Sequence, residues 1–156
     1  MELAIGLAGY GLAQVPPYHG RPSGRASVLV LACIDPRFTN DLAWFLSHNV
    51  ELKGDYDLFV LAGSELGVFH SPTWKQTFTE HVDIAIQLHG ISEVWCFSHM
   101  DCGMYKITYG VEEDTDKELH RANMRELLAF LESRYPALAF KGHIITLQGV
   151  ITPLRI

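Results

Sequence analysis

The segment 28–37, with the sequence VLVLACIDPR, joins an apolar run to a group of polar and metal-binding side chains. A short, continuous run of Val and Leu is typical of a strand that is buried on both faces. A second segment, 94–103 with the sequence VWCFSHMDCG, repeats this arrangement. Ligands of open α/β sheets gather at the carboxyl ends of the strands. The two segments therefore predict one shared site at that edge of a parallel sheet.

Three side chains at these strand ends, Cys33, His99 and Cys102, form a candidate metal site. Zinc favours thiolate sulfur and imidazole nitrogen, and three protein ligands leave a fourth position open, as in catalytic zinc sites. A lone cysteine at a strand end is more often a small core residue, but two such motifs together favour metal binding. Asp35 and Arg37 lie two residues apart, so they share a side of an extended chain and could pair with each other.

Composition excludes several classes of protein. The chain has 156 residues, of which 48% are hydrophobic and 19% charged, as expected for one globular domain with a sizeable core. Its net charge of −6 argues against a nucleic-acid partner, which needs a basic surface. No apolar run reaches the roughly 18 residues of a membrane-spanning helix. The three cysteines do not have the spacing of a secreted disulfide framework, so we expect a reducing, cytoplasmic location.

The sequence divides into an N-terminal arm and linker, residues 1–26, and a single zinc-binding α/β domain, residues 27–156. Residues 1–15 are apolar and Gly-rich, and their only charge is Glu2, so they lack the positive start of a signal peptide. Residues 16–26 are rich in Pro and Gly, as in a linker. Because exposed apolar surface usually finds a partner, we expect a homodimer or a larger homo-oligomer.

Apolar runs alternate with segments of helical periodicity along the remaining chain. The predicted strands cover residues 27–33, 57–61, 93–98 and 142–147, and the predicted helices cover residues 39–48, 73–89 and 116–134. A short helical or irregular piece follows Gly103, and residues 64–72 are expected to form a loop. This alternation predicts an α/β fold with a mostly parallel central sheet of about four strands and helices on both faces.

The motifs C-I-D-P-R at 33–37 and H-M-D-C-G at 99–103 resemble the pattern of the β-class carbonic anhydrases. The resemblance covers about residues 27–105. It includes Ala62-Gly63, which stand where that family has Asn-Ala-Gly. The resemblance implies the family's α/β fold and a homodimer or larger assembly with pockets near subunit interfaces.

The same resemblance assigns roles to five residues. It implies one Zn2+ held by Cys33, His99 and Cys102. It also implies a catalytic dyad in which Arg37 pairs with Asp35 and keeps that carboxylate off the metal. The implied activity is that of a zinc lyase, the reversible hydration of CO2 to bicarbonate by zinc-bound hydroxide.

The two Cys ligands and one His ligand should affect the pKa of zinc-bound water. Zinc lowers the pKa of bound water toward neutrality, as it does in the three-histidine site of other carbonic anhydrases. Two thiolates put more negative charge on the metal than two imidazoles, so the water should be less acidic here. Asp35, held by Arg37, is then a suitable hydrogen-bond acceptor for the hydroxide proton. Since CO2 is apolar, its pocket should be apolar, and Phe38, Leu61 and Tyr105 are candidates to line it.

Other functions remain open at this point. Val60-Leu61 replace the Arg-Asn that usually precedes Ala-Gly in the family, and residues before 27 do not resemble its helical arm. These departures favour a related zinc hydrolase of CS2 or COS, or a zinc-binding protein without catalysis. A metal-free thiol protein is disfavoured because the chain has no C-x-x-C pair. Asp101 is interpreted as a helix cap or as a supporting group for the site. No histidine is singled out as a proton shuttle among His48, His70, His81, His89, His120 and His143.

Overall fold

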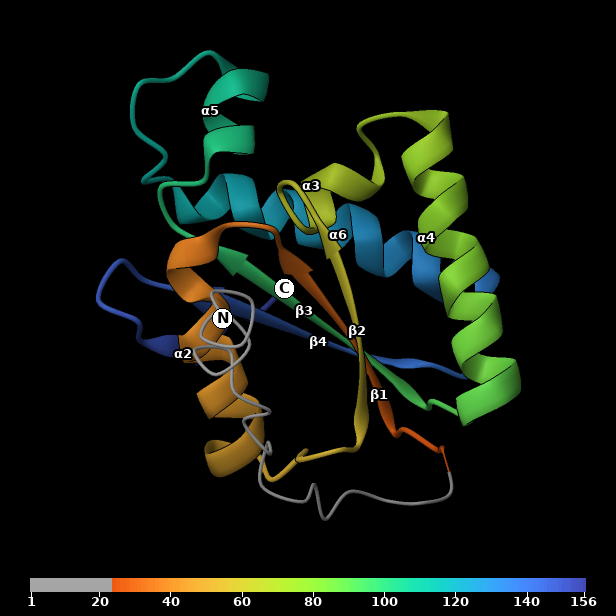
Figure 1. Ribbon diagram of the computed structural model, residues 1–156. Coiled ribbons are helices and arrows are strands. Elements are labelled where there is room, and N and C mark those ends of the chain that lie inside the picture. Colours follow the sequence, from red (N-terminus) through yellow and green to blue (C-terminus); the bar gives the residue numbers. More distant parts are fainter. Residues whose placement is uncertain (1–23) are drawn as a thin grey trace, which may run out of the picture.

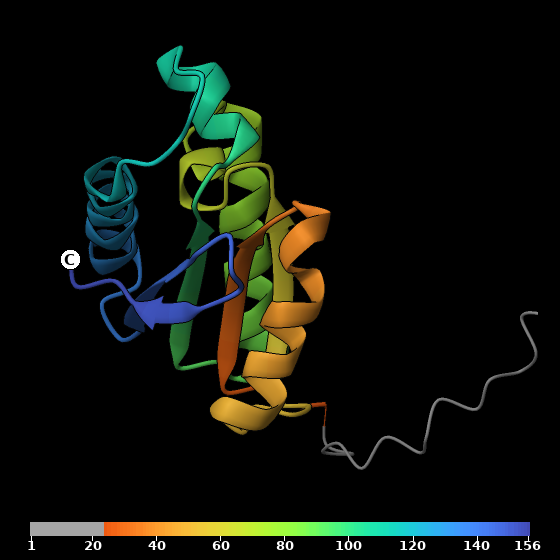
Figure 2. The same ribbon diagram turned by 90° about the vertical axis from the view of Figure 1, so that its left-hand side faces the viewer.

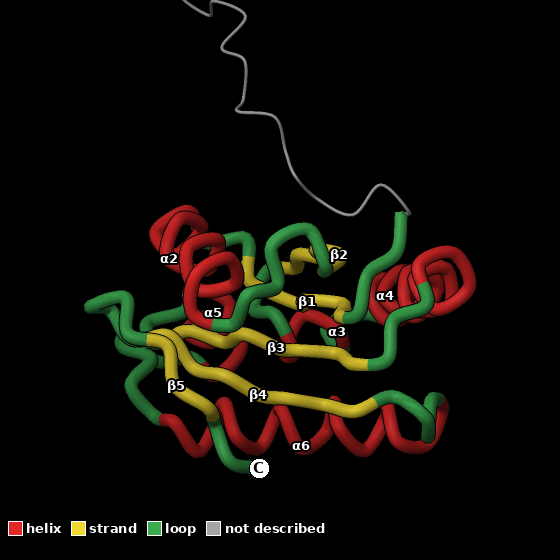
Figure 3. The backbone as a smooth tube through the Cα atoms, turned by 90° about the horizontal axis from the view of Figure 1, so that it is seen from below, coloured by secondary structure: helices red, strands yellow, loops and turns green. Residues whose placement is uncertain are grey.

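A computed structural model describes residues 24–156, so the predicted arm and linker lie almost wholly outside the described residues (Figure 1). The core is a five-stranded sheet in the order β2-β1-β3-β4-β5 (Figure 3). The strands are β1 (Val28–Cys33), β2 (Tyr56–Leu61), β3 (Glu93–His99), β4 (Ala139–Ile145) and β5 (Ile151–Pro153). The α-helices are α2 (Thr39–Trp44), α3 (Glu65–Val68), α4 (Pro72–Ile84), α5 (Gly103–Tyr109) and α6 (Lys117–Arg134).

The first four strands are parallel, which confirms the predicted sheet. β1 pairs with both β2 and β3, and β3 pairs with β4. The fifth strand, β5, pairs antiparallel with β4. It was not predicted because its three residues, Ile-Thr-Pro, carry no strand periodicity. A tight turn places it beside β4, with Gly149 at φ +74° and its amide donating to the Thr146 carbonyl.

Helices cover both faces of the sheet, as predicted (Figure 2). On one face, α4 and α6 pack on alternate residues of β1 and β3, including Leu31 and Cys96. On the other face, α2 packs on the intervening residues, including Val30 and Phe97. Because both faces are buried, these strands are nearly continuous apolar runs.

The elements differ from the predicted ones in several places. β4 begins at Ala139, earlier than predicted, because Lys141 pairs with Glu93 of β3 at 2.8 Å and so tolerates a strand position. The predicted helices 39–48 and 73–89 end in π-helical turns, Phe45–Asn49 and Ala85–His89. The expected loop 64–72 contains the short helix α3.

No helix among residues 24–156 is long and apolar enough to cross a membrane.

Candidate metal centre

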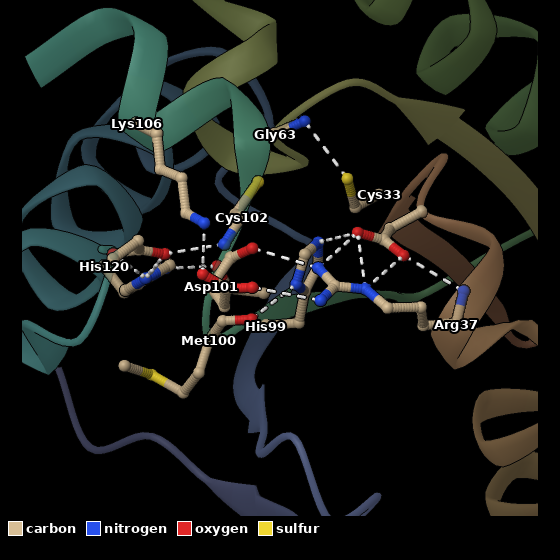
Figure 4. Close-up of polar contacts among 12 residues, drawn as sticks. Cys33, Arg37, Gly63, His99, Met100, Asp101, Cys102, Lys106 and His120 are labelled. Carbon is tan, nitrogen blue, oxygen red and sulfur yellow. Dashed lines mark hydrogen bonds and ion pairs between the residues drawn. The ribbon is translucent and has the colours of Figure 1, made fainter. Parts of the chain in front are cut away.

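The fold brings the three predicted ligands together. Cys33 ends β1, His99 ends β3, and Cys102 precedes α5 (Figure 4). Their potential ligand atoms all lie within 4.8 Å of one another. His99 and Cys102 are each only 2% exposed, whereas Cys33 is partly exposed. The parallel pairing of β1 with β3 produces this convergence, since it puts both carboxyl ends at one edge of the sheet.

The orientation of His99 suits a metal ligand. Its Nδ1 lies 2.9 Å from the Met100 carbonyl oxygen, to which it donates a hydrogen bond. The proton on Nδ1 leaves Nε2 with a free lone pair, as in most metal-binding histidines. Nε2 is buried and has no hydrogen-bond partner among the described residues. A bound cation would satisfy this buried nitrogen.

The two thiols also form a donor set that suits a cation. The pKa of Cys33 is lowered to about 4, first by a hydrogen bond from the Cys102 thiol and further by His99 and the Gly63 amide, against the effect of burial. The Gly63 N–H lies 3.3 Å from Cys33 Sγ. The pKa of Cys102 is raised, chiefly because its proton is shared with Cys33. One thiolate is thus present at neutral pH, and a zinc ion would displace the remaining proton.

Asp35 and Arg37 form the predicted pair beside these ligands. Arg37 donates to the Asp35 carboxylate through Nε at 3.0 Å, through Nη2 at 2.8 Å and through its backbone amide at 3.0 Å. These bonds lower the pKa of Asp35, so the carboxylate is ionised at neutral pH. Asp35 Oδ2 lies 3.8 Å from His99 Nε2, close to the candidate metal position.

Asp101 joins this pair from the loop that carries His99 and Cys102. Arg37 donates to the Asp101 carboxylate through Nη1 at 3.0 Å and to the Asp101 carbonyl through Nη2 at 3.0 Å. Lys106 forms a second ion pair with Asp101. The helix-cap interpretation of Asp101 is wrong, because Cys102 is the N-cap residue of α5. Its contacts with Arg37 agree with the other interpretation, that of a supporting group.

An apolar cavity of about 110 Å³ adjoins the site. Cys33, Asp35 and His99 contribute to its wall, and the remaining wall is largely apolar, with Phe38, Leu42, Leu46, Val60 and Phe97 among its residues. Phe38 was one of the predicted pocket residues. Leu61 and Tyr105 are not in this wall. Leu61 packs against the core under α4, and Tyr105 is buried and donates to Glu65 at 2.5 Å.

Solved structures similar to this one include several carbonic anhydrases, most of them described as β-class. The structure superposes on a carbonic anhydrase from Streptococcus mutans with a TM-score of 0.60 and 18% identity, covering 99% of this chain and 93% of that one. It superposes on tetrameric β-carbonic anhydrases from Sordaria macrospora with a TM-score of 0.62 and 15% identity. This match covers 99% of this chain and 94% of the other chain. This chain has the β-carbonic anhydrase fold. The predicted resemblance is therefore confirmed at the level of the fold.

Sequence comparison adds relatives whose function is not described. No protein-family model matches the chain. An uncharacterized protein of Rickettsia conorii is 25% identical over 144 residues, which is 88% of this chain and 77% of that protein. An uncharacterized protein of Rickettsia bellii is 24% identical over 144 residues, which is 88% of this chain and 87% of that protein.

Within this β-carbonic anhydrase fold, a buried polar cluster lies behind Cys102. The Asp114 carboxylate accepts a hydrogen bond from the Cys102 amide at 3.0 Å and lies 2.9 Å from His120 Nε2. His120 is fully buried, so it is unsuited to exchange protons with solvent as a shuttle. Sequence reasoning did not assign Asp114 or Glu65 to the site, although Glu65 stands in an apolar segment where a charged residue is unusual. Cys96 is buried and contacts Glu65, and burial raises its pKa, so its thiol stays protonated and unreactive.

Proposed function

We propose that this chain is a zinc-dependent carbonic anhydrase that hydrates CO2 reversibly to bicarbonate. One observation carries the proposal. The Asp35 carboxylate is held in the fork of Arg37 beside the Cys33, His99 and Cys102 cluster, on the wall of an apolar cavity. The β-carbonic anhydrase fold supports it.

Cys33, His99 and Cys102 would hold the zinc. Their sulfur and nitrogen atoms match the preferences of this metal, and three protein ligands leave one position for a small molecule. A zinc ion held in this way acidifies water and so supplies a nucleophile near neutral pH.

The chain's own residues then have separate tasks. Asp35 accepts a hydrogen bond from the reacting water and so orients it, because its lowered pKa keeps the carboxylate ionised at neutral pH. Arg37 orients this carboxylate through a bidentate contact that a lysine cannot reproduce. The apolar wall, including Phe38 and Val60, suits the apolar CO2 molecule.

A related zinc hydrolase of CS2 or COS is the second candidate. Val60 lines the cavity and is 46% exposed, in a segment where the family usually has polar residues. A more apolar entrance favours a substrate in which the larger and more polarisable sulfur replaces oxygen. This alternative uses the same metal and the same dyad.

Zinc content and stopped-flow CO2 hydration of the purified protein test the proposal. We expect about one zinc per chain and hydration that is lost in Asp35→Asn. The exposed Asp83 pairs with Arg134 away from the site, so Asp83→Asn is a matched control that should keep full activity. Zinc-loaded protein that hydrates CO2 at no pH but hydrolyses CS2 or COS would establish the second candidate. Inactivity toward all three substrates would leave a zinc-binding protein without catalysis.

A further inference from the structure

Arg37 is held on two sides, although the dyad requires only one. Its Nε and Nη2 face Asp35, while Nη1 and Nη2 face the Asp101 carboxylate and carbonyl (Figure 4). The side chain is 46% exposed, so apart from these contacts water could compete for the guanidinium. Asp101 thus connects the dyad, which follows β1, to the metal-binding loop, which follows β3.

The backbone of Asp101 is held in an uncommon conformation. Its φ is +60°, and only Glu51 and Ser64 share a positive φ among the non-glycine residues of the described region. Asp and Asn tolerate this conformation better than most side chains. The Asp101 amide donates to the Asp114 carbonyl at 2.8 Å, and Lys106 pairs with the carboxylate on its other side. Asp101 is therefore held by contacts that do not involve Arg37.

We propose that Asp101 is a positioning residue that orients Arg37 so that Asp35 stays off the metal. The proposal rests on the metal site of the proposed function. The physical reason is competition for Asp35, whose Oδ2 lies only 3.8 Å from the candidate ligand atom His99 Nε2. A carboxylate so close to a divalent cation is drawn to it unless another cation holds it. Removing Asp101 frees the guanidinium to turn toward solvent and weakens its hold on Asp35.

This role differs from a contribution to overall stability. Exposed ion pairs contribute little to the free energy of unfolding, so loss of the Asp101 carboxylate should leave the fold intact. Its effect should appear in the fraction of molecules whose fourth metal position is open. The apparent affinity of an exogenous ligand is reduced in proportion to that fraction.

The test uses azide binding to the cobalt(II)-substituted full-length protein, followed by visible absorption. Asp101→Gly and Asp101→Asn suit the test because both residues accept φ +60°. We expect Asp101→Gly to weaken apparent azide affinity by roughly three- to tenfold, the range of a charge-assisted contact at a partly exposed site. Asp101→Asn keeps one acceptor oxygen and should weaken it less. In an Asp35→Ala background, Asp101→Gly should have no effect, because no carboxylate remains to close the site.

The double-mutant comparison separates positioning from a general disturbance of the loop. Cobalt content should be unchanged in every variant, and Asp83→Asn should bind azide like wild type. Equal azide affinity in wild type and Asp101→Gly would overturn the proposal. An equal loss with and without Asp35 would also overturn it, as would a wild type that binds azide only after Asp35→Ala. Azide binding does not require catalysis, so a protein that fails to hydrate CO2 refutes the proposed function without deciding the role of Asp101.

Discussion

At the scale of single residues, Arg37 determines where the Asp35 carboxylate lies. Arg37→Ala should let Asp35 bind the metal and reduce CO2 hydration below detection, while zinc content stays at the wild-type level. Arg37→Lys should restore activity only in part, since an ammonium group cannot form the two parallel hydrogen bonds of a guanidinium. Stopped-flow hydration from neutral to alkaline pH, together with elemental analysis, checks both variants. Full activity in Arg37→Ala would show that the dyad does not have this role.

A second residue, His143, should make stability depend on pH. It is 6% exposed, stacks on Phe97 at 4.5 Å, and burial lowers its pKa to about 4. The unfolded chain, in which histidine titrates near 6.5, therefore binds the proton more readily than the folded protein. Neutral His143 therefore contributes to the free energy of unfolding. This contribution is fully present above pH 6.5 and is lost as the pH falls from 6.5 to 4, by up to roughly 3 kcal/mol.

His143→Phe should remove this part of the pH dependence while keeping the stacking on Phe97. Urea denaturation of both proteins at pH 7 and pH 5 measures the difference. Carboxylates titrate in both proteins, so only the difference between them reports on His143. An identical loss of stability in the two proteins would show that His143 is not responsible.

At the scale of secondary structure, the segment that joins β2 to α3 contacts the candidate metal site through Gly63. Gly67 allows this, because a Cβ at that position would lie 2.4 Å from the Ala62 carbonyl oxygen. Gly67→Ala must therefore shift the segment whose Gly63 amide donates to Cys33 Sγ. We expect a loss of about 1–3 kcal/mol in the free energy of unfolding and weaker zinc binding. Competition with a chromophoric chelator measures the zinc affinity.

Gly103 at the start of α5 provides the matched control. A Cβ at Gly103 would meet nothing within 4 Å, so Gly103→Ala should leave stability and zinc affinity close to wild type. If both alanine variants behave alike, the close approach of Gly67 to Ala62 does not support the site.

At the scale of the whole molecule, metal binding should be coupled to folding. The candidate ligands come from the ends of β1 and β3 and the start of α5, so a bound ion would join three elements. A Cys33→Ala, Cys102→Ala double variant should lose most of its zinc and melt at a lower temperature than the zinc-loaded wild type. Full zinc occupancy in this variant, measured by elemental analysis, would contradict the ligand assignment.

The exposed face of the molecule supports the predicted homo-oligomer. Within the described region β2 is an edge strand, and its Leu58 and Val60 are 57% and 46% exposed. Trp44 of α2 is 63% exposed. Apolar side chains at a sheet edge favour association with another chain. We expect light scattering at micromolar concentration to give at least a dimer, and Leu58→Lys to lower the measured mass. A stable wild-type monomer would contradict this expectation.

Local patterns are sufficient to predict much of this architecture. Each apolar run ending in Cys33 or His99 indicates a buried strand, and alternation with helical segments predicts the parallel sheet and its layers. Apolar runs and helical periodicity are both local signals, because each is defined by residues that are close together in the sequence. The candidate ligands Cys33, His99 and Cys102 follow from their chemistry and their placement at strand ends.

Contacts between distant segments could be found only in the tertiary structure. Arg37 and Asp101 are 64 residues apart, so their contact cannot be predicted from the sequence. It depends on the register of β1 against β3. β5 exists because β4 offers it a hydrogen-bonding edge, and its own three residues are too few to show a strand pattern. The apolar cavity likewise depends on packing of α2 against the sheet, which places Phe38 on its wall and leaves Leu61 out of it. Such features arise from how elements pack, and packing is decided by shape and register across the whole chain.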